Sequence, residues 1–167
     1  MARYTNAQLL AIRAAITANS TWNAYPLTDD GFTDLAAQLN KLTSPAYIIW
    51  NEAVSVTKTM TGAFDWTRVD NLSVGKARII EWMDRAGLVN AGDTAVIAGV
   101  NAAFSAVGDA TSRQVIFNGM TRTAREVEKI LATGAGTLPT NLGVGPSTVA
   151  VPGPISPDHV REARQAV

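Results

Sequence analysis

The stretch from Asp65 to Gly87 constrains the fold more than any other part of the chain, because it combines tryptophans, aliphatic residues and charges at helical spacing. Read as helix, its apolar residues form a stripe wide enough to be covered on more than one side. Gly87 is a suitable stop, since glycine readily takes the left-handed conformation that closes a helix. We predict a short helix, a turn near 70–73 and a longer helix to Ala86. Its side chains expected in the core or in a tight subunit interface are Trp66, Ile80, Trp82 and Met83.

Helical periods and cap residues predict further helices on both sides of this stretch. The first follows Thr5 or Asn6, and the second opens after Thr28 with an acidic first turn, as the helix dipole prefers. Ser44 followed by Pro45 predicts a helix start. The expected helices cover about 6–18, 29–42, a segment from 45, part of 52–62, 93–107 and 110–132. Because no strand alternation is convincing before residue 133, we predict an all-α helical bundle, without a sheet, over 1–132.

Composition changes sharply at Thr133. Residues 133–157 include five glycines and five prolines, with no charged or aromatic side chain. Proline and glycine oppose helix and regular sheet, so we predict an extended Pro/Gly-rich C-terminal arm over 133–167, with a short terminal helix after Ser156. The arm is expected to bind a neighbouring chain through its apolar side chains, and the alternative is that it folds back on its own body. These partner-binding candidates are Leu138, Leu142, Val144, Val149, Val151 and Ile155.

Charge is sparse and balanced, with 14 Lys+Arg, 14 Asp+Glu and 17% charged residues in total. Soluble domains usually carry about 25%, so part of the surface is expected to be covered by something else. A chain without net charge has little electrostatic protection against self-association. Arg122, Arg125 and Lys129 recur at spacings of three and four, which predicts one face of the last long helix. That face is either solvated or in contact with an acidic partner surface or a DNA backbone.

No catalytic, cofactor-binding or metal-binding residue is predicted. The chain has no cysteine, which excludes disulfides, thiolate zinc sites and thiol catalysis. The Gly75-Lys76 pair lacks the other residues of a phosphate-binding loop. The single histidine, His159, is expected in solvent, and the acids and bases of the central stretch are expected to form helical ion pairs. No apolar run approaches ~18 residues, so no membrane span is expected.

The run from Asp65 to Met83, DWTRVDNLSVGKARIIEWM, resembles a motif in small proteins of tailed bacteriophages and prophages, and the similarity extends from the first helix to Thr137. Such proteins are encoded among head and tail assembly genes. The resemblance therefore implies a structural virion component and brings no catalytic residues. A small helical body with a C-terminal arm is also similar to head-to-tail adaptor proteins. Those proteins form a ring beneath the portal and send their C-terminal segment into a neighbouring subunit.

We therefore expect a virion protein that is not an enzyme, is made in the host cytoplasm and needs no cofactor. Its most concrete form is a ring-forming head–tail adaptor, or connector, that binds the portal and tail components. Another head-completion or tail-associated protein is the alternative within this class. A helical DNA-binding packaging factor, with non-specific contacts to packaged DNA, and a peptidoglycan-cleaving enzyme belong to different classes. Residues 1–132 carry 12 Lys+Arg and 12 Asp+Glu, so their composition shows no basic excess to favour DNA binding.

Overall fold

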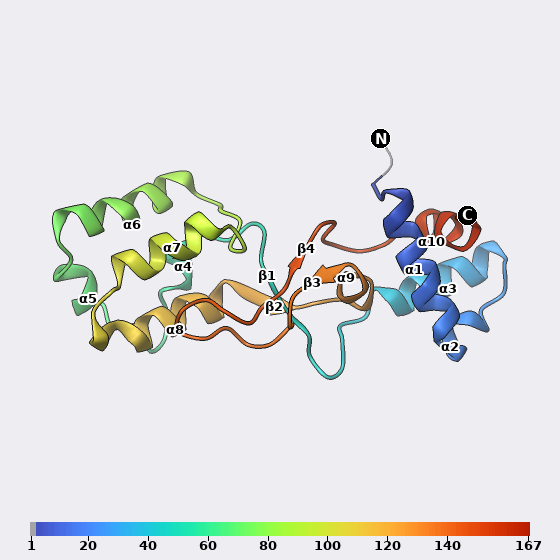
Figure 1. The fold of residues 1–167 in the computed structure, drawn as a ribbon, viewed down its shortest axis with the longest axis horizontal. Coiled ribbons are helices and arrows are strands. Elements are labelled where there is room, and N and C mark those ends of the chain that lie inside the picture. The colour runs from blue at the N-terminus through green and yellow to red at the C-terminus, as the bar shows by residue number, and fades with distance from the viewer. Residues whose placement is uncertain (1–2) are drawn as a thin grey trace. The chain divides into compact units, whose positions relative to one another are not determined.

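The computed structural model describes residues 3–167, and the chain is mostly α-helical, as the sequence predicts (Figure 1). It divides into two compact units, and each unit is built from segments that are distant in sequence. Unit 1 takes the chain up to Tyr47 together with Thr123–Thr133 and Val149–Val167. Unit 2 takes Ile48–Arg122 and Gly134–Thr148. The predicted division into a body over 1–132 and an arm over 133–167 does not coincide with these units.

Unit 1 is a small group of helices. Its elements are α1 (Asn6–Ala18), α2 (Ser20–Asn23), α3 (Asp29–Leu39), α9 (Glu126–Ile130) and α10 (Pro157–Gln165). The predicted caps of the first two long helices are confirmed, because Thr5 accepts from the Gln8 N–H and Thr28 from the Gly31 N–H. Helix α10 packs on α1 and α3. The core between them includes Ile12, Ile16, Leu35, Leu39, Val127 and Val160.

The predicted terminal helix is α10, which begins as expected after Ser156. The Ser156 hydroxyl accepts from the His159 N–H, and Pro157 occupies the first turn, where its missing N–H costs nothing. Val160 and Ala163 are buried in the core of unit 1. This part of the predicted arm is therefore packed against its own chain.

Unit 2 contains α4 (Val56–Thr59), α5 (Thr67–Asp70), α6 (Val74–Ala86), α7 (Thr94–Ala103), the 3-10 turn η1 (Val107–Asp109) and α8 (Ala110–Gly119). Helix α6 packs on α7, and α4 contacts both α6 and α8. Figure 1 shows α6 and α7 running side by side. The core of unit 2 is centred on side chains that are fully buried, which are Met83, Val100, Phe104, Ile116, Phe117 and Met120.

Short strands within residues 3–167 correct the prediction of a body over 1–132 without a sheet. They are β1 (Ile48–Trp50), β2 (Thr121–Thr123), β3 (Ala132–Thr133) and β4 (Thr148–Val149), and they pair as β1 with β2 and β3 with β4. The predicted helix from Pro45 is wrong, because β1 occupies its place. The continuous helix over 110–132 is also wrong. It ends at Gly119, and the β-branched Thr121 and Thr123 then continue as strand, for which such residues are well suited.

The central stretch has the predicted division into α5, a turn and α6, and Gly87 closes α6 at φ 72°. Ile80 and Met83 are buried, as predicted. Trp66 and Trp82 are 57% and 58% exposed, so their assignment to the core is wrong. Their alternative placement in a subunit interface stays a prediction. Among the described residues, no helix has the length and apolar character needed to cross a membrane.

Candidate functional site

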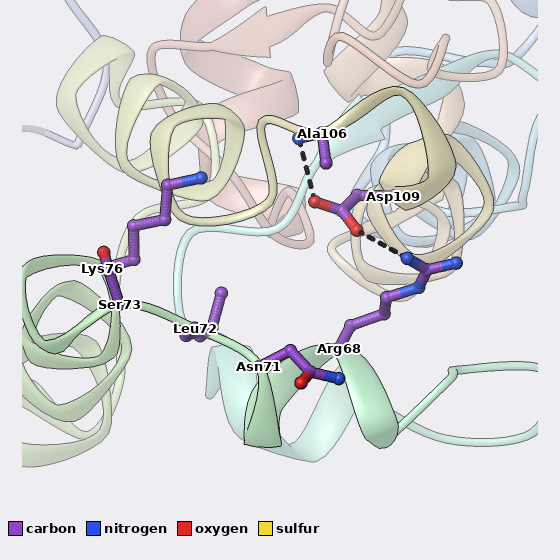
Figure 2. Close-up of a pocket in the computed structure, with 7 residues that line it drawn as sticks. All are labelled: Arg68, Asn71, Leu72, Ser73, Lys76, Ala106 and Asp109. Carbon is purple, nitrogen blue, oxygen red and sulfur yellow. Dashed lines mark hydrogen bonds and ion pairs between the residues drawn. The ribbon is translucent and has the colours of Figure 1, made fainter.

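A pocket of about 260 Å³ opens in unit 2 between α5, the start of α6 and the turn that precedes α8 (Figure 2). Five of its seven lining residues are polar, and these include two cations and one carboxylate. The side chains come from two short stretches of the sequence that the fold brings together. The lining residues are Arg68, Asn71, Leu72, Ser73, Lys76, Ala106 and Asp109.

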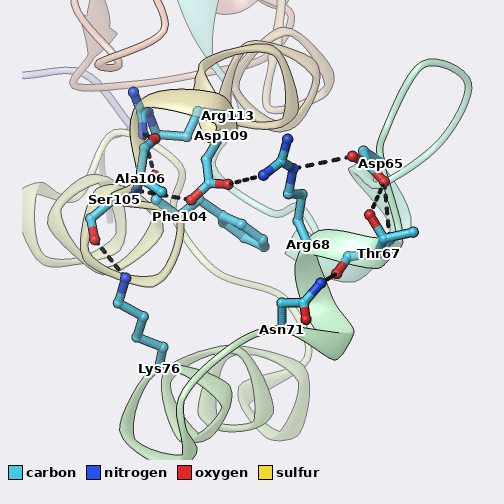
Figure 3. A network of polar contacts seen from close by, with 10 residues as sticks. All are labelled: Asp65, Thr67, Arg68, Asn71, Lys76, Phe104, Ser105, Ala106, Asp109 and Arg113. Atoms are coloured by element: carbon cyan, nitrogen blue, oxygen red, sulfur yellow. Dashed lines mark hydrogen bonds and ion pairs between the residues drawn. The ribbon is translucent and has the colours of Figure 1, made fainter.

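Arg68 and Asp109 form the centre of this pocket. Asp109 is buried, accepts a hydrogen bond of 2.9 Å from the Ala106 N–H and lies 3.6 Å from Nη1 of Arg68. A Cβ atom on Gly108 would stand only 3.0 Å from the Arg68 guanidinium, so glycine lets the turn approach the arginine closely. Arg68 also binds Asp65 through Nε at 3.1 Å (Figure 3). One guanidinium thus connects two carboxylates.

Asp65 supports Arg68 from the solvent side. It accepts from the Thr67 hydroxyl at 2.6 Å and from the Thr67 N–H at 3.1 Å. The hydroxyl hydrogen bond is the main cause that holds the pKa of the Asp65 carboxyl below its usual value, and the Thr67 N–H and the Arg68 charge add to it. The carboxylate therefore stays ionised and fixes the orientation of Arg68.

Two further cations hold the turn before α8 (Figure 3). Arg113 is buried and donates to the carbonyl oxygens of Phe104, Ala106 and Asn141. Lys76 on α6 donates from Nζ to the Ser105 hydroxyl at 2.6 Å. These contacts of Arg68, Lys76 and Arg113 connect α5, α6 and α8 to the turn.

The chemistry available in this pocket is limited. Both oxygens of the buried Asp109 carboxylate already have partners within the chain, one in the Ala106 N–H and the other in the Arg68 guanidinium. Within residues 3–167, no group of three or more His, Asp or Glu side chains is arranged to hold a metal ion. We interpret the Arg68–Asp109 network as a structural connection between elements.

The predicted partner-binding residues of the arm fall into two groups. Leu138, Leu142 and Val144 belong to unit 2 and are 56–69% exposed. Val149 and Val151 are half-buried in unit 1, and Ile155 is buried in its core. Only the first group remains free, in the structure of one chain, to contact another molecule.

The exposed group lies on a loop that is fixed in place, the 137–145 loop. Two hydrogen bonds join the two sides of this loop. The Thr137 N–H donates to the Gly145 carbonyl, and the Thr140 N–H donates to the Val144 carbonyl. Helices α7 and α8 hold it from the other side through side chains that donate to loop carbonyls. These bonds are Asn101 to Leu142 at 3.1 Å, Arg113 to Asn141 at 2.9 Å and Gln114 to Pro139 at 2.7 Å.

The predicted basic face is wrong, because its three residues do not lie on one helix. Arg122 is in β2, Arg125 precedes α9 and Lys129 is in α9. Arg125 lies 3.8 Å from the carboxylate of Glu128, and Lys129 stands 6.0 Å from the centre of the Tyr47 ring.

Glu128 is a residue whose role the sequence interpretation missed. It is fully buried and accepts from the Arg125 N–H at 2.8 Å and the Gly153 N–H at 2.6 Å. A glutamate three residues after a helix cap can reach back to the cap N–H, so the spacing from Arg125 to Glu128 was a usable signal. The bond to Gly153 was not predictable from local spacing.

Comparison with known proteins adds no further constraint: no protein-family model, curated protein or solved structure matches the chain. Function is therefore inferred from the motif resemblance and from the geometry of the described residues. The most informative part of that geometry is the fixed 137–145 loop with its exposed apolar side chains.

Proposed function

We propose that the chain is a structural component of a tailed-phage virion, and most concretely a subunit of a ring-forming head–tail adaptor that docks to the portal. The observation that carries this proposal is the 137–145 loop, which presents Leu138, Leu142 and Val144 to solvent. The resemblance of the central stretch to small phage proteins gives the biological context. The proposed partners are neighbouring copies of the chain and the portal.

The loop is suited to binding because its backbone is already ordered before a partner binds. Side chains from α7 and α8 already fix its backbone, so little conformational entropy remains to be lost on docking. Gly143, at φ 75°, lets the loop pack closely on unit 2, since a Cβ there would stand 2.9 Å from Ile97 and 3.1 Å from Phe117. Burying three aliphatic side chains against a neighbour would then stabilise an assembly by the hydrophobic effect.

The exposed Trp66 and Trp82 offer two further contact positions on unit 2. Trp82 lies on α6 beside Arg78 and Arg85, and Trp66 packs edge-on against Phe64 at 5.1 Å. Tryptophan and arginine are the residues most enriched among energetically dominant interface positions. The balanced charge of the chain also places no strong self-repulsion in the way of a homo-oligomer.

Binding to packaged DNA receives less support than the adaptor role. Arg122, Arg125 and Lys129 do not form one helix face, and Arg125 is paired with Glu128. A DNA-binding surface needs cations gathered along the phosphate backbone. The peptidoglycan-cleaving alternative would need a carboxylate pair flanking a cleft, and the Arg68–Asp109 pocket does not supply one.

The proposal is tested by measuring assembly of the purified chain with native mass spectrometry and negative-stain electron microscopy over a range of concentrations. We expect closed rings of the wild type. A triple variant, Leu138→Ser, Leu142→Ser and Val144→Thr, should remain monomeric with an unchanged circular dichroism spectrum. In particles from the phage or prophage that encodes the chain, a photo-reactive amino acid in place of the exposed Thr140 should cross-link the 137–145 loop to a neighbouring copy or to the portal.

The matched control changes exposed apolar side chains outside the loop, namely Leu27→Ser, Leu88→Ser and Val107→Thr, which are 67–96% exposed. This control should assemble like the wild type. The adaptor proposal is wrong if the loop variant and the control assemble equally well, or if the chain is absent from purified particles.

A further inference from the structure

A second cavity, of about 190 Å³, lies within unit 1 and is lined by residues of α1, the end of α2, the segment that follows α2, and α10. Its wall combines two arginines from different helices with polar and apolar side chains. Thr17 and Asn23 add a hydroxyl and an amide, and Ile16 and Leu27 supply the apolar part. The two arginines are Arg13 of α1 and Arg164 of α10.

Neither arginine of this cavity is neutralised within the described part of the chain. The ion pairs found there, at N···O distances up to 4.0 Å, include none for Arg13 or Arg164. Arg161, one helical turn from Arg164, is by contrast paired with both Asp29 and Asp158. The cavity therefore brings together two positive charges, and neither forms an ion pair with a carboxylate among residues 3–167.

Backbone carbonyls hold the two guanidinium groups in place. Arg13 donates from Nη1 to the Ala166 carbonyl. Arg164 donates from Nη1 to the Tyr25 carbonyl at 3.2 Å and from Nη2 to the Asn23 carbonyl at 3.4 Å. A guanidinium has more N–H donors than these bonds use, so both side chains keep donors for a further acceptor.

We propose that this cavity binds one small oxyanion of phosphate size, held between Arg13 and Arg164. Planar guanidinium groups recognise oxyanions through paired, charge-assisted hydrogen bonds, and a bound anion would offset the repulsion between the two cations. The cavity is too small for a continuous polymer, and the neighbouring Arg161 is already paired, which disfavours a nucleic-acid backbone. This binding site is independent of the proposed adaptor role.

The test is isothermal titration calorimetry of the full chain with inorganic phosphate, with ionic strength matched by sodium chloride. We expect one phosphate per chain. Arg13→Gln and Arg164→Gln should each weaken binding by about tenfold or more, as expected for loss of charge-assisted hydrogen bonds. Arg13→Lys should give an intermediate loss, because it keeps the charge and removes the paired donors.

The matched control is Arg78→Gln, an exposed arginine of α6 in unit 2, which should leave phosphate binding unchanged. Circular dichroism identifies any variant that fails to fold, and Arg13→Lys gives the readout if Arg164→Gln is unstable. The proposal is wrong if the wild type shows no phosphate binding beyond a chloride control, or if Arg78→Gln weakens it equally. It is also wrong if a DNA duplex binds with this arginine dependence and free phosphate does not compete.

Discussion

Tyr4 and Glu128 are polar side chains buried in unit 1, and they differ in whether their polar atoms have hydrogen-bond partners. Glu128 accepts hydrogen bonds from two backbone N–H groups, whereas the buried Tyr4 hydroxyl has no hydrogen-bond partner among the described residues. Burial is the main cause that raises the pKa of Tyr4; the Arg3 charge opposes it, and the Glu128 charge adds to it. The two side chains should therefore respond differently to conservative replacement.

Tyr4→Phe removes a hydroxyl without a partner and keeps the ring that packs edge-on against His159, with centroids 5.0 Å apart. We expect the free energy of unfolding at pH 7 to stay unchanged or to rise by up to ~1 kcal/mol. Urea denaturation measures it, with Tyr25→Phe as the control. A loss larger than 1 kcal/mol would mean that the hydroxyl has a stabilising partner.

The same variant carries a pH prediction. Because the pKa of Tyr4 is raised in the folded state, the unfolded chain releases this proton first as the pH passes about 10. The folded state then binds more protons than the unfolded state, so the free energy of unfolding falls as the pH rises. The contribution of Tyr4 to the free energy of unfolding is fully present below pH ~10, the unfolded pKa, and is lost as the pH rises through the higher pKa of the folded state. Tyr4→Phe should show a shallower alkaline decline than the wild type.

Glu128→Gln should lower the free energy of unfolding by ~2–3 kcal/mol, because the amide group cannot accept from both backbone donors and loses its charge. Glu126→Gln, a less buried neighbour in the same helix, is the control and should change stability by less than ~0.5 kcal/mol. Thermal denaturation of both variants measures the difference. Equal effects would argue against a special role for the buried carboxylate.

At the scale of elements, local signals predicted helices well where a cap and an apolar period agreed. Thr5, Thr28, Gly87 and Ser156 each mark a helix boundary that the structure confirms. The signals failed where pairing over long sequence distances decides the state, as it does for β1 and β2. Strand pairing depends on what lies opposite in the fold, which a helical period cannot reveal.

The candidate site was less predictable than the helices for the same reason. Periodicity placed Trp66 and Trp82 on an apolar stripe, but it does not tell which part of a stripe is covered. Arm composition indicated extended chain, yet it could not show that Asn101, Arg113 and Gln114 would fix the 137–145 loop. Such contacts depend on three-dimensional proximity.

Helix α6 allows a direct test with adjacent residues. Met83 is 1% exposed, so Met83→Ala should cost ~2–5 kcal/mol through lost burial and a cavity. Trp82→Ala removes a side chain that is 58% exposed, and it should change the stability of the monomer by less than ~1 kcal/mol. Denaturant titration at low protein concentration compares them. A larger loss for Trp82→Ala would show that the tryptophan packs more tightly than the structure indicates.

At the scale of the whole molecule, the division into two units changes what a truncation should do. The predicted division into a body over 1–132 and an arm over 133–167 implies that a cut at Thr133 leaves a folded body. The structure predicts that such a cut removes Gly134–Thr148 from unit 2 and Val149–Val167 from unit 1. Both units would lose part of their packing.

Removal of Val149–Val167 alone should unfold unit 1 and spare unit 2. The truncation takes Ile155, Val160 and Ala163 out of the core of unit 1. Hydrogen exchange measured by mass spectrometry should show loss of protection in α1 and α3, while α6, α7 and α8 remain protected. If α1 and α3 stay protected after the truncation, α10 is not required for the fold of unit 1.

Unit 1 can be completed only at the end of synthesis on the ribosome, because its segments come from both ends of the chain. Helices α1 and α3 are made first, yet α10, which covers them, is made last. At about 5–20 residues per second, the roughly 110 residues from Tyr47 to Pro157 take on the order of 5–20 s to translate. During that interval the nascent N-terminal helices expose the apolar faces that α10 later buries, so we expect this segment to be bound by chaperones that recognise emerging chains.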